Sequence, residues 1–335
     1  MKLLITGGAG FLGTRLARTL LARGTLAGQD IERIVLADQV APAPDLAADA
    51  RVQVRTGALL DQCTALTDAG FDGVFHLASA VSSECEADFD LGMRSNLDSM
   101  RALLDALRRA TEAGRSAPRL VFASSVAVFG ADPALPLPPV VRDDTLPTPQ
   151  SSYGIQKFIC EQLVAEYTRK GYIDGRSARL MTVSVRPGKP NAAASSFLSG
   201  IIREPLAGIE ARCPVSAQTE VALASPARTI AGLIAVFEAD REAFGGRTAL
   251  NLPALTVRVQ DMLDALAEVA GPAILAHVCF EPDAGVARIV GGWPARFESQ
   301  RAARLALSPD PDFRSIVLQY MQEHPHSVAL PLNIA

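Results

Sequence analysis

The sequence has few of the residues that build metal sites or disulfide frameworks. Its 335 residues include only four histidines, one tryptophan and five cysteines. The cysteines are odd in number and scattered, without the close pairs that zinc sites and small disulfide-bonded domains use. We therefore expect no bound metal, and free thiols typical of a cytoplasmic protein. These residues are Cys63, Cys85, Cys160, Cys213 and Cys279.

An excess of charge of one sign and long apolar runs are also lacking. The net charge is −4, which gives no long-range attraction to nucleic acid or to anionic membranes. No stretch reaches the roughly 20 consecutive apolar residues that a transmembrane helix needs. We therefore expect a small molecule as the partner, rather than nucleic acid or a membrane. The apolar share of 49% and the charged share of 20% indicate a globular chain.

Short apolar runs alternate with longer amphipathic patterns in the first half of the chain. This alternation is typical of βαβ units, so it predicts an α/β fold with a doubly wound parallel sheet, the Rossmann fold. The predicted strands are Lys2–Thr6, Arg33–Ala37, Val52–Arg55, Gly73–Leu77, Leu120–Ser124 and Thr182–Val185. The predicted helices are Phe11–Arg23, Leu91–Ala113 and Tyr153–Gly171.

A glycine-rich segment, TGGAGFLG at residues 6–13, joins the first predicted strand to the first predicted helix. Gly7 permits a tight turn, Gly10 lets the backbone approach a pyrophosphate, and Gly13 lets the helix pack closely on the sheet. The helix N-terminus adds N–H donors and partial positive charge. A glycine run used only as a turn has no need of this position, so the segment predicts a dinucleotide site.

An acidic residue, Asp38, follows the second predicted strand. It stands at about the spacing at which a carboxylate accepts hydrogen bonds from the adenosine ribose hydroxyls. A carboxylate there repels the 2′-phosphate of NADP, so NAD is the predicted cofactor. Arg15 would favour NADP if it faced that phosphate, but we interpret it as a solvated residue of the first helix.

Tyr153 and Lys157 lie four residues apart on a predicted helix, a spacing that places both on one face. A phenol acts as a base at neutral pH only where its anion is stabilised. A neighbouring ammonium group provides this stabilisation. Ser125 follows a predicted strand, at the edge where open α/β sheets bind ligands. These three residues predict a proton-transfer site.

The motifs together resemble those of the extended short-chain dehydrogenase/reductase family, which includes nucleotide-sugar epimerases and dehydratases. The resemblance covers nearly the whole chain. It rests on the glycine segment, on His76-Leu77-Ala78-Ser79 after the fourth strand, on Asn96 in the next helix, on Ser125 before Val128-Phe129-Gly130, and on Tyr153 with Lys157.

The resemblance implies a role for each matching residue. Tyr153 would be the acid/base, Ser125 would hydrogen-bond the reacting oxygen, and Lys157 would hold the nicotinamide ribose and stabilise the Tyr153 anion. The residues implied to contact the cofactor or support its site are Gly7, Gly10, Phe11, Leu12, Gly13, Asp38, Leu59, Leu77, Ala78, Ser79, Asn96, Tyr153, Lys157 and Pro187.

Prolines change the character of the chain in two places. Six prolines between residues 131 and 150 predict a surface loop just before the Tyr153 helix. After Pro187, further prolines break the chain into short elements. We therefore assign residues 1–187 to an NAD-binding domain. Residues 188–335 are assigned mainly to a smaller substrate-binding lobe, with some segments packing back on the sheet.

Two short segments carry the substrate prediction. Residues 186–196, RPGKPNAAASS, and residues 224–230, ASPARTI, resemble a narrower group of family members that oxidise a small sugar acid. In sugar-nucleotide epimerases the residue matching Lys189 is commonly asparagine, so a lysine indicates an anionic substrate. Lys189, Asn191 and Arg228 would bind it together with Ser125 and Tyr153. The alternatives are a solvated loop lysine for Lys189 and a surface ion pair for Arg228.

Three functions fit this set of motifs: a dehydrogenase that releases NADH, an epimerase or dehydratase that keeps its NAD, and a non-catalytic NAD-sensing regulator. Val126 and Ala127 stand where a dehydratase usually has acidic residues, and regulators tend to lose the tyrosine or the lysine. We therefore expect a dehydrogenase. Arg186 recurs across the broad family, so it carries no information about the substrate. Family members often dimerise through the helix carrying the tyrosine and the helix before it, so the resemblance implies a homodimer.

Overall fold

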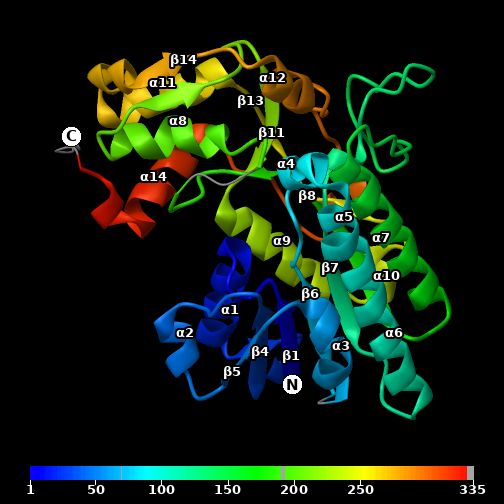
Figure 1. Ribbon diagram of the computed structural model, residues 1–335. Coiled ribbons are helices and arrows are strands. Elements are labelled where there is room, and N and C mark those ends of the chain that lie inside the picture. Colours follow the sequence, from blue (N-terminus) through cyan, green and yellow to red (C-terminus); the bar gives the residue numbers. More distant parts are fainter. Residues whose placement is uncertain (69, 190–192, 330–335) are drawn as a thin grey trace.

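A seven-stranded parallel sheet forms the centre of the larger lobe (Figure 1). The computed structural model describes residues 1–68, 70–189 and 193–329. The strand order is β12-β8-β7-β6-β1-β4-β5, and every neighbouring pair is parallel. The strands are β1 (Lys2–Thr6), β4 (Arg33–Asp38), β5 (Val52–Thr56), β6 (Gly73–His76), β7 (Arg119–Ser125), β8 (Asp174–Leu180) and β12 (Leu250–Asn251). The order runs outward in both directions from β1, which confirms the predicted doubly wound Rossmann fold.

The prediction of the sixth strand is wrong. The sheet uses β8, whereas the predicted segment Thr182–Val185 contains only the short strand β9 (Thr182–Val183), which belongs to a separate sheet. Charged residues interrupt the apolar pattern of β8, so the sequence pattern did not predict this strand. In the fold, Arg176 and Arg179 of β8 are 0% and 6% exposed, and both form ion pairs with acidic neighbours.

Helices cover both faces of the sheet. Leu3 and Ile5 of β1 point into one hydrophobic core and Leu4 points into the other, as the alternation of a strand requires. The helices that pack into the first core are α1 (Phe11–Arg23) and α9 (Pro226–Glu238). Those that pack into the second are α3 (Leu59–Asp68), α6 (Ser99–Glu112) and α7 (Ser152–Arg169).

The long helix predicted over residues 91–113 changes its winding along its length. It comprises α5 (Phe89–Gly92), a π-helical segment (Met93–Asp98) and α6. A π-helical turn inserts extra backbone and re-aims the side chains within it, and such turns are frequent at functional sites. Asn96 lies in this turn and is buried.

A smaller lobe sits above the carboxyl end of the sheet (Figure 1) and has a hydrophobic core of its own. Its three-stranded sheet has the order β13-β11-β9, and two further strands pair beside it. The strands are β9, β11 (Glu220–Ala224), β13 (Leu255–Arg258), β10 (Ala211–Cys213) and β14 (Val278–Phe280). The helices are α8 (Phe197–Leu206), α11 (Val259–Ala270), α12 (Ala284–Gly291) and α14 (Phe313–Glu323).

Segments from the second half of the chain also belong to the larger lobe. Helix α9 packs against β7, β8 and α1, and β12 extends the central sheet beside β8. The remaining short elements are β2 (Thr25–Leu26), β3 (Gln29–Asp30), α2 (Pro44–Ala48), α4 (Ser82–Ala87), α10 (Arg241–Phe244) and α13 (Gln300–Arg304). The chain therefore crosses between the lobes several times.

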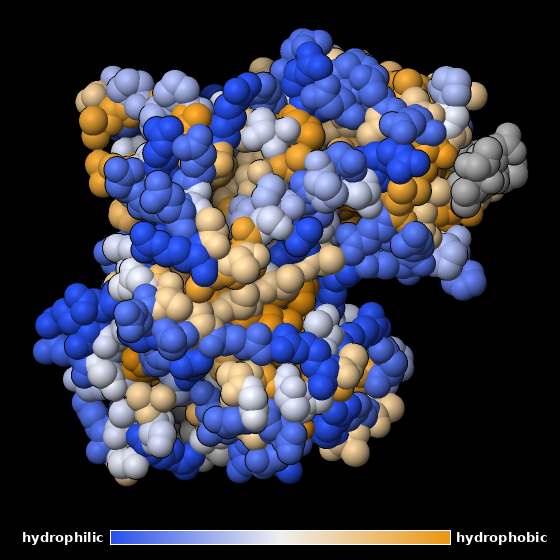
Figure 2. Space-filling model, turned by 180° about the vertical axis from the view of Figure 1, so that it is seen from behind, coloured by the Kyte–Doolittle hydropathy of each residue, from blue (hydrophilic) through white to orange (hydrophobic). Residues whose placement is uncertain are grey.

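The loop over residues 131–150 contains no helix, as its prolines predict. Its Val141 is buried and forms an isolated parallel bridge with Phe297. Seen from behind, apolar residues form a band across the waist between the lobes, while hydrophilic residues cover much of both (Figure 2). In the part of the chain that the structure describes, every helix falls short of the length and apolarity required to cross a bilayer.

Candidate active site

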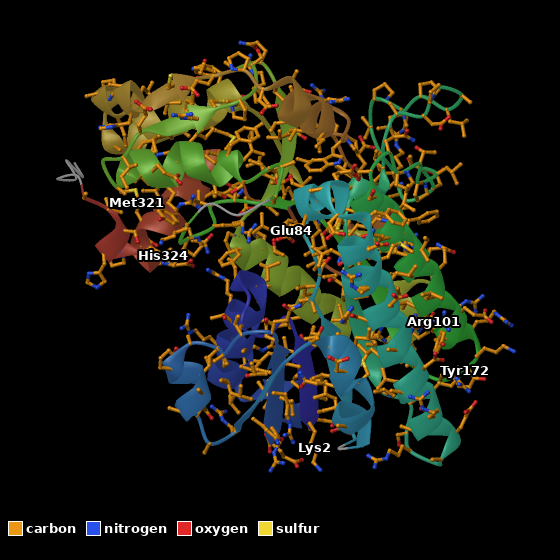
Figure 3. The ribbon with its side chains drawn as sticks, in the orientation of Figure 1. Lys2, Glu84, Arg101, Tyr172, Met321 and His324 are labelled. Atoms are coloured by element: carbon orange, nitrogen blue, oxygen red, sulfur yellow. The ribbon has the colours of Figure 1, made fainter. Side chains whose placement is uncertain are left out.

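A cavity of about 940 Å³ lies at the carboxyl edge of the central sheet. Figure 3 shows this placement, with Lys2 at the amino end of β1 and Glu84, a cavity residue, at the opposite end near the smaller lobe. Walls from both lobes enclose it, because residues from the glycine segment, β4, the segment after β6, β7, α7 and the segment before α8 all line it. Parallel sheets bind ligands at this edge, where the strand order diverges.

The glycine segment closes one end of the cavity. Gly7 has φ of +70°, and a Cβ atom there would lie 2.8 Å from the backbone nitrogen of Ala78, so a larger residue does not fit. A Cβ atom at Gly13 would overlap the carbonyl oxygen of Gly7. A Cβ atom at Gly10 would contact only that same carbonyl. The segment thus forms a close-packed turn whose backbone, together with Phe11 and Leu12, lines the cavity.

Asp38 stands at the end of β4 and lines the same cavity. One of its carboxylate oxygens accepts a hydrogen bond from the backbone nitrogen of Ala9, at 3.0 Å, which ties the strand end to the glycine segment. The predicted solvated Arg15 instead forms a two-pronged ion pair with Glu323 of α14, at 2.5 and 2.6 Å. This pairing directs Arg15 toward the smaller lobe.

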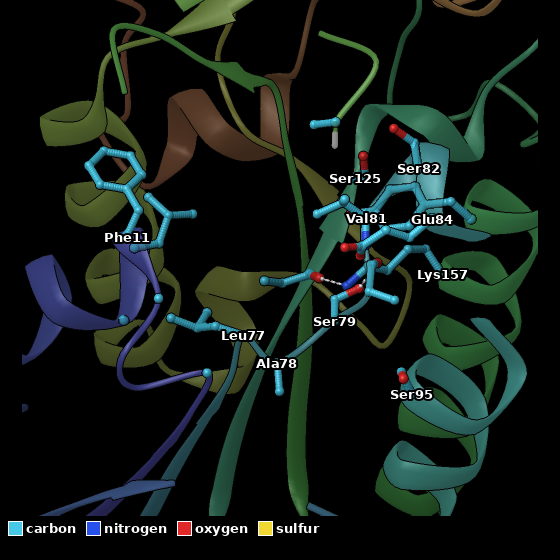
Figure 4. A pocket seen from close by; sticks show the side chains of 18 of the residues that line it. Phe11, Leu77, Ala78, Ser79, Val81, Ser82, Glu84, Ser95, Ser125 and Lys157 are labelled. Carbon is cyan, nitrogen blue, oxygen red and sulfur yellow. Dashed lines mark hydrogen bonds between the residues drawn. The ribbon is translucent and has the colours of Figure 1, made fainter. Parts of the chain in front are cut away.

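The segment after β6 is held by a side-chain amide. The Asn96 carbonyl oxygen accepts hydrogen bonds from the backbone nitrogen of Ala80, at 2.8 Å, and from the Ser79 hydroxyl, at 3.0 Å. Its amide nitrogen donates to the Gln156 carbonyl oxygen at 2.8 Å. Asn96 is not on the cavity wall, but it shapes the loop in which Leu77, Ala78 and Ser79 line the cavity. Figure 4 shows these three residues along the base of the cavity.

A buried histidine, His76, lies directly beneath this loop and was not predicted to have a role of its own. Nδ1 of His76 lies 2.7 Å from the Thr6 hydroxyl, and its ring stacks on Phe122. Burial, and then the positive charge of Lys157, lower the pKa of His76 to about 3, so the ring is neutral at pH 7. The contact between Thr6 and His76 joins the ends of β1 and β6. In the sequence, it is indicated only by the polar residue that ends each of these apolar strands.

Ser125, Tyr153 and Lys157 meet in the cavity, as Figure 4 shows for Ser125 and Lys157. Lys157 is only 3% exposed; its ammonium group donates to the carbonyl oxygen of Ala123 at 2.9 Å and lies 5.5 Å from the centre of the Tyr153 ring. The Ser125 hydroxyl oxygen accepts a hydrogen bond from the backbone nitrogen of Ala127 at 3.1 Å. The arrangement sets a cation beside a phenol and a hydroxyl at the end of β7.

A buried ion pair fixes α7 to the sheet. Glu161 lies one turn beyond Lys157 and is 2% exposed; its two carboxylate oxygens accept hydrogen bonds from Arg179 of β8 at 2.9 and 2.7 Å. The Ser124 hydroxyl donates to the same carboxylate at 2.5 Å. Because Ser124 and Ser125 are adjacent, this network sets the catalytic helix against the strand that carries Ser125. Sequence reasoning missed it because β8 itself was not found.

The cations named as substrate ligands do not line the cavity. Lys189 is exposed, and Arg228 is exposed on α9, whose opposite face packs against the sheet. Asn191 lies outside the described residues. Pro187 is half-buried and is also absent from the cavity wall, whereas the neighbouring Arg186 is part of it. Leu59 lines the wall beside the glycine segment.

A family model described as the NAD dependent epimerase/dehydratase family matches residues 3–217. This range includes the glycine segment and Ser125, Tyr153 and Lys157. The chain belongs to this family. Its cofactor is NAD, and the residues fit it, since the close-packed glycine turn, the N-terminus of α1 and the carboxylate of Asp38 line one continuous cavity.

Two relatives within this family match almost end to end. A D-erythronate dehydrogenase of Cupriavidus necator is 51% identical over 96% of this chain and 98% of its own length. A D-erythronate dehydrogenase of Haemophilus influenzae is 41% identical over 96% of this chain and 99% of its own length. A crystal structure described as the nucleoside-diphosphate-sugar epimerase from Agrobacterium tumefaciens superposes with a TM-score of 0.91, at 40% identity over 98% of this chain and 95% of that one.

Proposed function

We propose that the protein is an NAD-dependent D-erythronate dehydrogenase, which oxidises the C2 hydroxyl of this four-carbon sugar acid to 2-dehydro-D-erythronate. The observation that carries the proposal is the extent of the likeness to the two D-erythronate dehydrogenases. It covers 96% of the chain and so includes the smaller lobe as well as the sheet. A likeness to the NAD-binding half alone would leave the substrate open.

Ser125, Tyr153 and Lys157 would carry out the proton transfer. The Ser125 oxygen already accepts the Ala127 N–H, so its own hydrogen is available for the oxygen on C2 of the substrate. The Tyr153 oxygen would take the hydroxyl proton as the bond between C2 and its hydrogen breaks. The Lys157 ammonium, held by the Ala123 carbonyl, would stabilise the phenolate that receives this proton.

The cofactor residues are proposed in the same way. The backbone of Gly10, Phe11 and Leu12 at the start of α1 would hold the pyrophosphate, and Asp38 would accept the ribose hydroxyls. Lys157 would donate to the nicotinamide ribose. NAD, when bound, supplies the acceptor for the hydride that leaves C2.

The organisation of the molecule follows from this assignment. Residues 1–187, with α9 and β12, would form the NAD-binding domain, and most of residues 188–335 would form the substrate lobe. We place the enzyme in the cytoplasm, as a homodimer. Exposed apolar residues on α7 support the dimer, since Ile155 and Ile159 are 46% and 38% exposed.

The second candidate is a nucleotide-sugar 4-epimerase or dehydratase that keeps its NAD. The description of the Agrobacterium tumefaciens structure as an epimerase favours it. The two candidates differ in one observable, because a dehydrogenase releases NADH in proportion to the sugar acid added, whereas an epimerase shows no net reduction of NAD.

An NAD-reduction assay over sugar acids of four to six carbons and the corresponding neutral sugars tests the proposal. We expect D-erythronate to give the highest kcat/KM, with NADH formed in proportion to substrate. Tyr153→Phe should lower kcat by about 1,000-fold, the loss typical of a general acid/base, and leave NAD binding intact. Reduction of NAD by neutral sugars only, or full activity of Tyr153→Phe, would contradict the proposal.

A further inference from the structure

Arg186 is a cation on the wall of the cavity that also holds Tyr153 and Ser125. Its side chain is half-buried, and its guanidinium carbon lies 5.6 Å from the centre of the Phe11 ring. It is close enough to Tyr153 for the two side chains to interact electrostatically. Because β8 ends at Leu180, Arg186 lies in the connection between the lobes rather than at the end of a strand of the central sheet.

Arg186 forms no ion pair with an acidic residue in the part of the chain that the structure describes. Burial lowers the pKa of its guanidinium, and the nearby charge of Arg203 lowers it further. A cation withdrawn from water without an acidic partner costs free energy. Such a group on a cavity wall indicates that the cavity takes an anion.

The backbone of Arg186 is fixed by two side chains of α8. Its N–H donates to the Ser199 hydroxyl at 3.0 Å, and its carbonyl oxygen accepts from the Arg203 guanidinium at 2.7 Å. Arg203 is itself buried and paired with Glu204. The base of the Arg186 side chain is therefore positioned before any ligand binds, which lowers the entropic cost of binding.

We infer that Arg186 binds the carboxylate of the substrate, an inference that rests on the proposed function. In a 2-hydroxy acid the carboxylate carbon is bonded directly to C2, so its cation must lie beside the groups that act on the C2 hydroxyl. Arg186 lines the same cavity as Tyr153 and Ser125, within electrostatic range of Tyr153. Lys189 and Arg228 are outside the cavity wall. The planar guanidinium also matches a carboxylate with two parallel hydrogen bonds.

The NAD pyrophosphate offers the same anionic chemistry, since Phe11 begins α1. That anion already has the helix N-terminus and the backbone N–H groups of the glycine segment to receive it. Besides Arg186, the described part of the wall carries two cations: Lys157, whose ammonium donates to the Ala123 carbonyl, and Arg94, which is exposed on the π-helical segment. The experiment separates these two sources.

The test compares Arg186→Met, which keeps an unbranched apolar stem and loses the charge, with the wild type on two substrates. D-Erythronate carries the carboxylate, and erythritol replaces it with a neutral hydroxymethyl group. We expect Arg186→Met to raise KM for D-erythronate by about 100-fold and to change kcat/KM for erythritol by less than about threefold. The Kd for NAD, measured by calorimetry, should stay within about twofold.

Three further variants complete the comparison. Arg186→Lys should recover part of the affinity for D-erythronate, because it keeps the charge and loses the planar fork, and it guards against a folding defect in Arg186→Met. Arg212→Met, at an exposed arginine of β10 in the smaller lobe, is the matched control and should behave as wild type. Lys189→Met tests the rival cation directly.

Each outcome decides the inference. A loss of NAD affinity equal to the rise in KM would overturn it in favour of the pyrophosphate, and a large effect of Lys189→Met with none from Arg186→Met would move the carboxylate to Lys189. Wild-type protein that fails to oxidise D-erythronate would refute the proposed function alone. In that case, Arg186 is tested by calorimetry of the NAD-saturated protein with the sugar acids of the screen. The inference then requires that Arg186→Met weakens the binding of the tightest-binding sugar acid. It is overturned if no sugar acid binds.

Discussion

At the scale of single residues, burial changes the chemistry that a side chain can perform. His76 is the clearest case. Its ring is 1% exposed and its pKa falls to about 3, so it serves as a neutral hydrogen-bonding group between Thr6 and the cavity floor rather than as an acid or a base. A histidine near an active site invites a catalytic role, and here the low pKa removes it.

This burial predicts a pH dependence of stability. The unfolded histidine binds a proton below a pKa of about 6.5, while the folded His76 resists protonation down to about 3. The unfolding free energy is therefore unaffected above about pH 6.5 and falls as the pH drops toward 3, by up to about 1.4 kcal/mol per pH unit. His76→Gln should remove this contribution, which urea unfolding at about pH 4, 5, 6 and 7 would measure. Equal slopes for the two proteins would show that His76 titrates normally in the folded state.

The same scale shows what could be predicted from the sequence. Gly7, Gly13, Tyr153 and Lys157 come to one cavity because their spacing follows local rules, namely a turn that only glycine fits and a helix face at i and i+4. The role inferred for Arg186 could not be predicted from such local rules. Its position depends on contacts with α8 and on the true end of β8, which no short pattern reveals.

At the scale of elements, the orientation of α7 depends on a charged network within the core. Glu161 joins the helix to Arg179 of β8 and to Ser124 of β7. Arg179 also donates to the Asn251 side chain of β12, at 3.3 Å. One acidic residue therefore positions the helix that carries Tyr153 against the three strands β7, β8 and β12.

Removing one partner of this network should be costly. Glu161→Gln leaves the Arg179 charge buried without its counter-ion, so we expect the free energy of unfolding to fall by about 3–5 kcal/mol, measured by urea denaturation. The double variant Glu161→Leu with Arg179→Met removes both charges and should recover most of that loss. The kcat of this double variant should be below that of the wild type, because Ser124 no longer forms a hydrogen bond that holds α7 in place. A loss below about 1 kcal/mol in Glu161→Gln would mean that the charge is well solvated.

The network also explains the one wrong strand prediction. An apolar run is a good guide to a buried strand only when burial is achieved by apolar residues. Strand β8 is buried with two arginines, each paired with an acid that lies elsewhere in the chain or two residues away. The pairing partner of Arg179 is on α7, so the evidence for the strand is present in the sequence only as a relation between distant residues.

At the scale of the whole molecule, the two lobes share the chain but keep separate cores. Arg15 of α1 and Glu323 of α14 form an ion pair between them, with side chains 23% and 30% exposed. A pair that is open to solvent contributes little to stability, about 1 kcal/mol or less. The contact therefore adds little to the free energy that holds the two lobes together.

The proposed dimer gives a prediction at this scale. Replacing two exposed apolar residues of α7 by charges, in Ile155→Glu with Ile159→Glu, should convert the dimer to monomers, because like charges would face each other across the interface. Sedimentation velocity of the wild type and the variant measures this. Leu135→Glu, at a residue 53% exposed in the loop over residues 131–150, is the matched control and should remain dimeric. A wild-type protein that sediments as a monomer would refute the proposal.

The lone tryptophan gives the protein an optical reporter of its own. Trp293 is the single tryptophan of the chain, and it forms part of the cavity wall. All tryptophan emission therefore originates at the wall of the candidate active-site cavity. Reduced nicotinamide absorbs in the range where tryptophan emits, so the filling of the cavity by NADH should quench this emission by energy transfer. Turnover and product release can then be followed on the unlabelled enzyme, without a dye and without a variant.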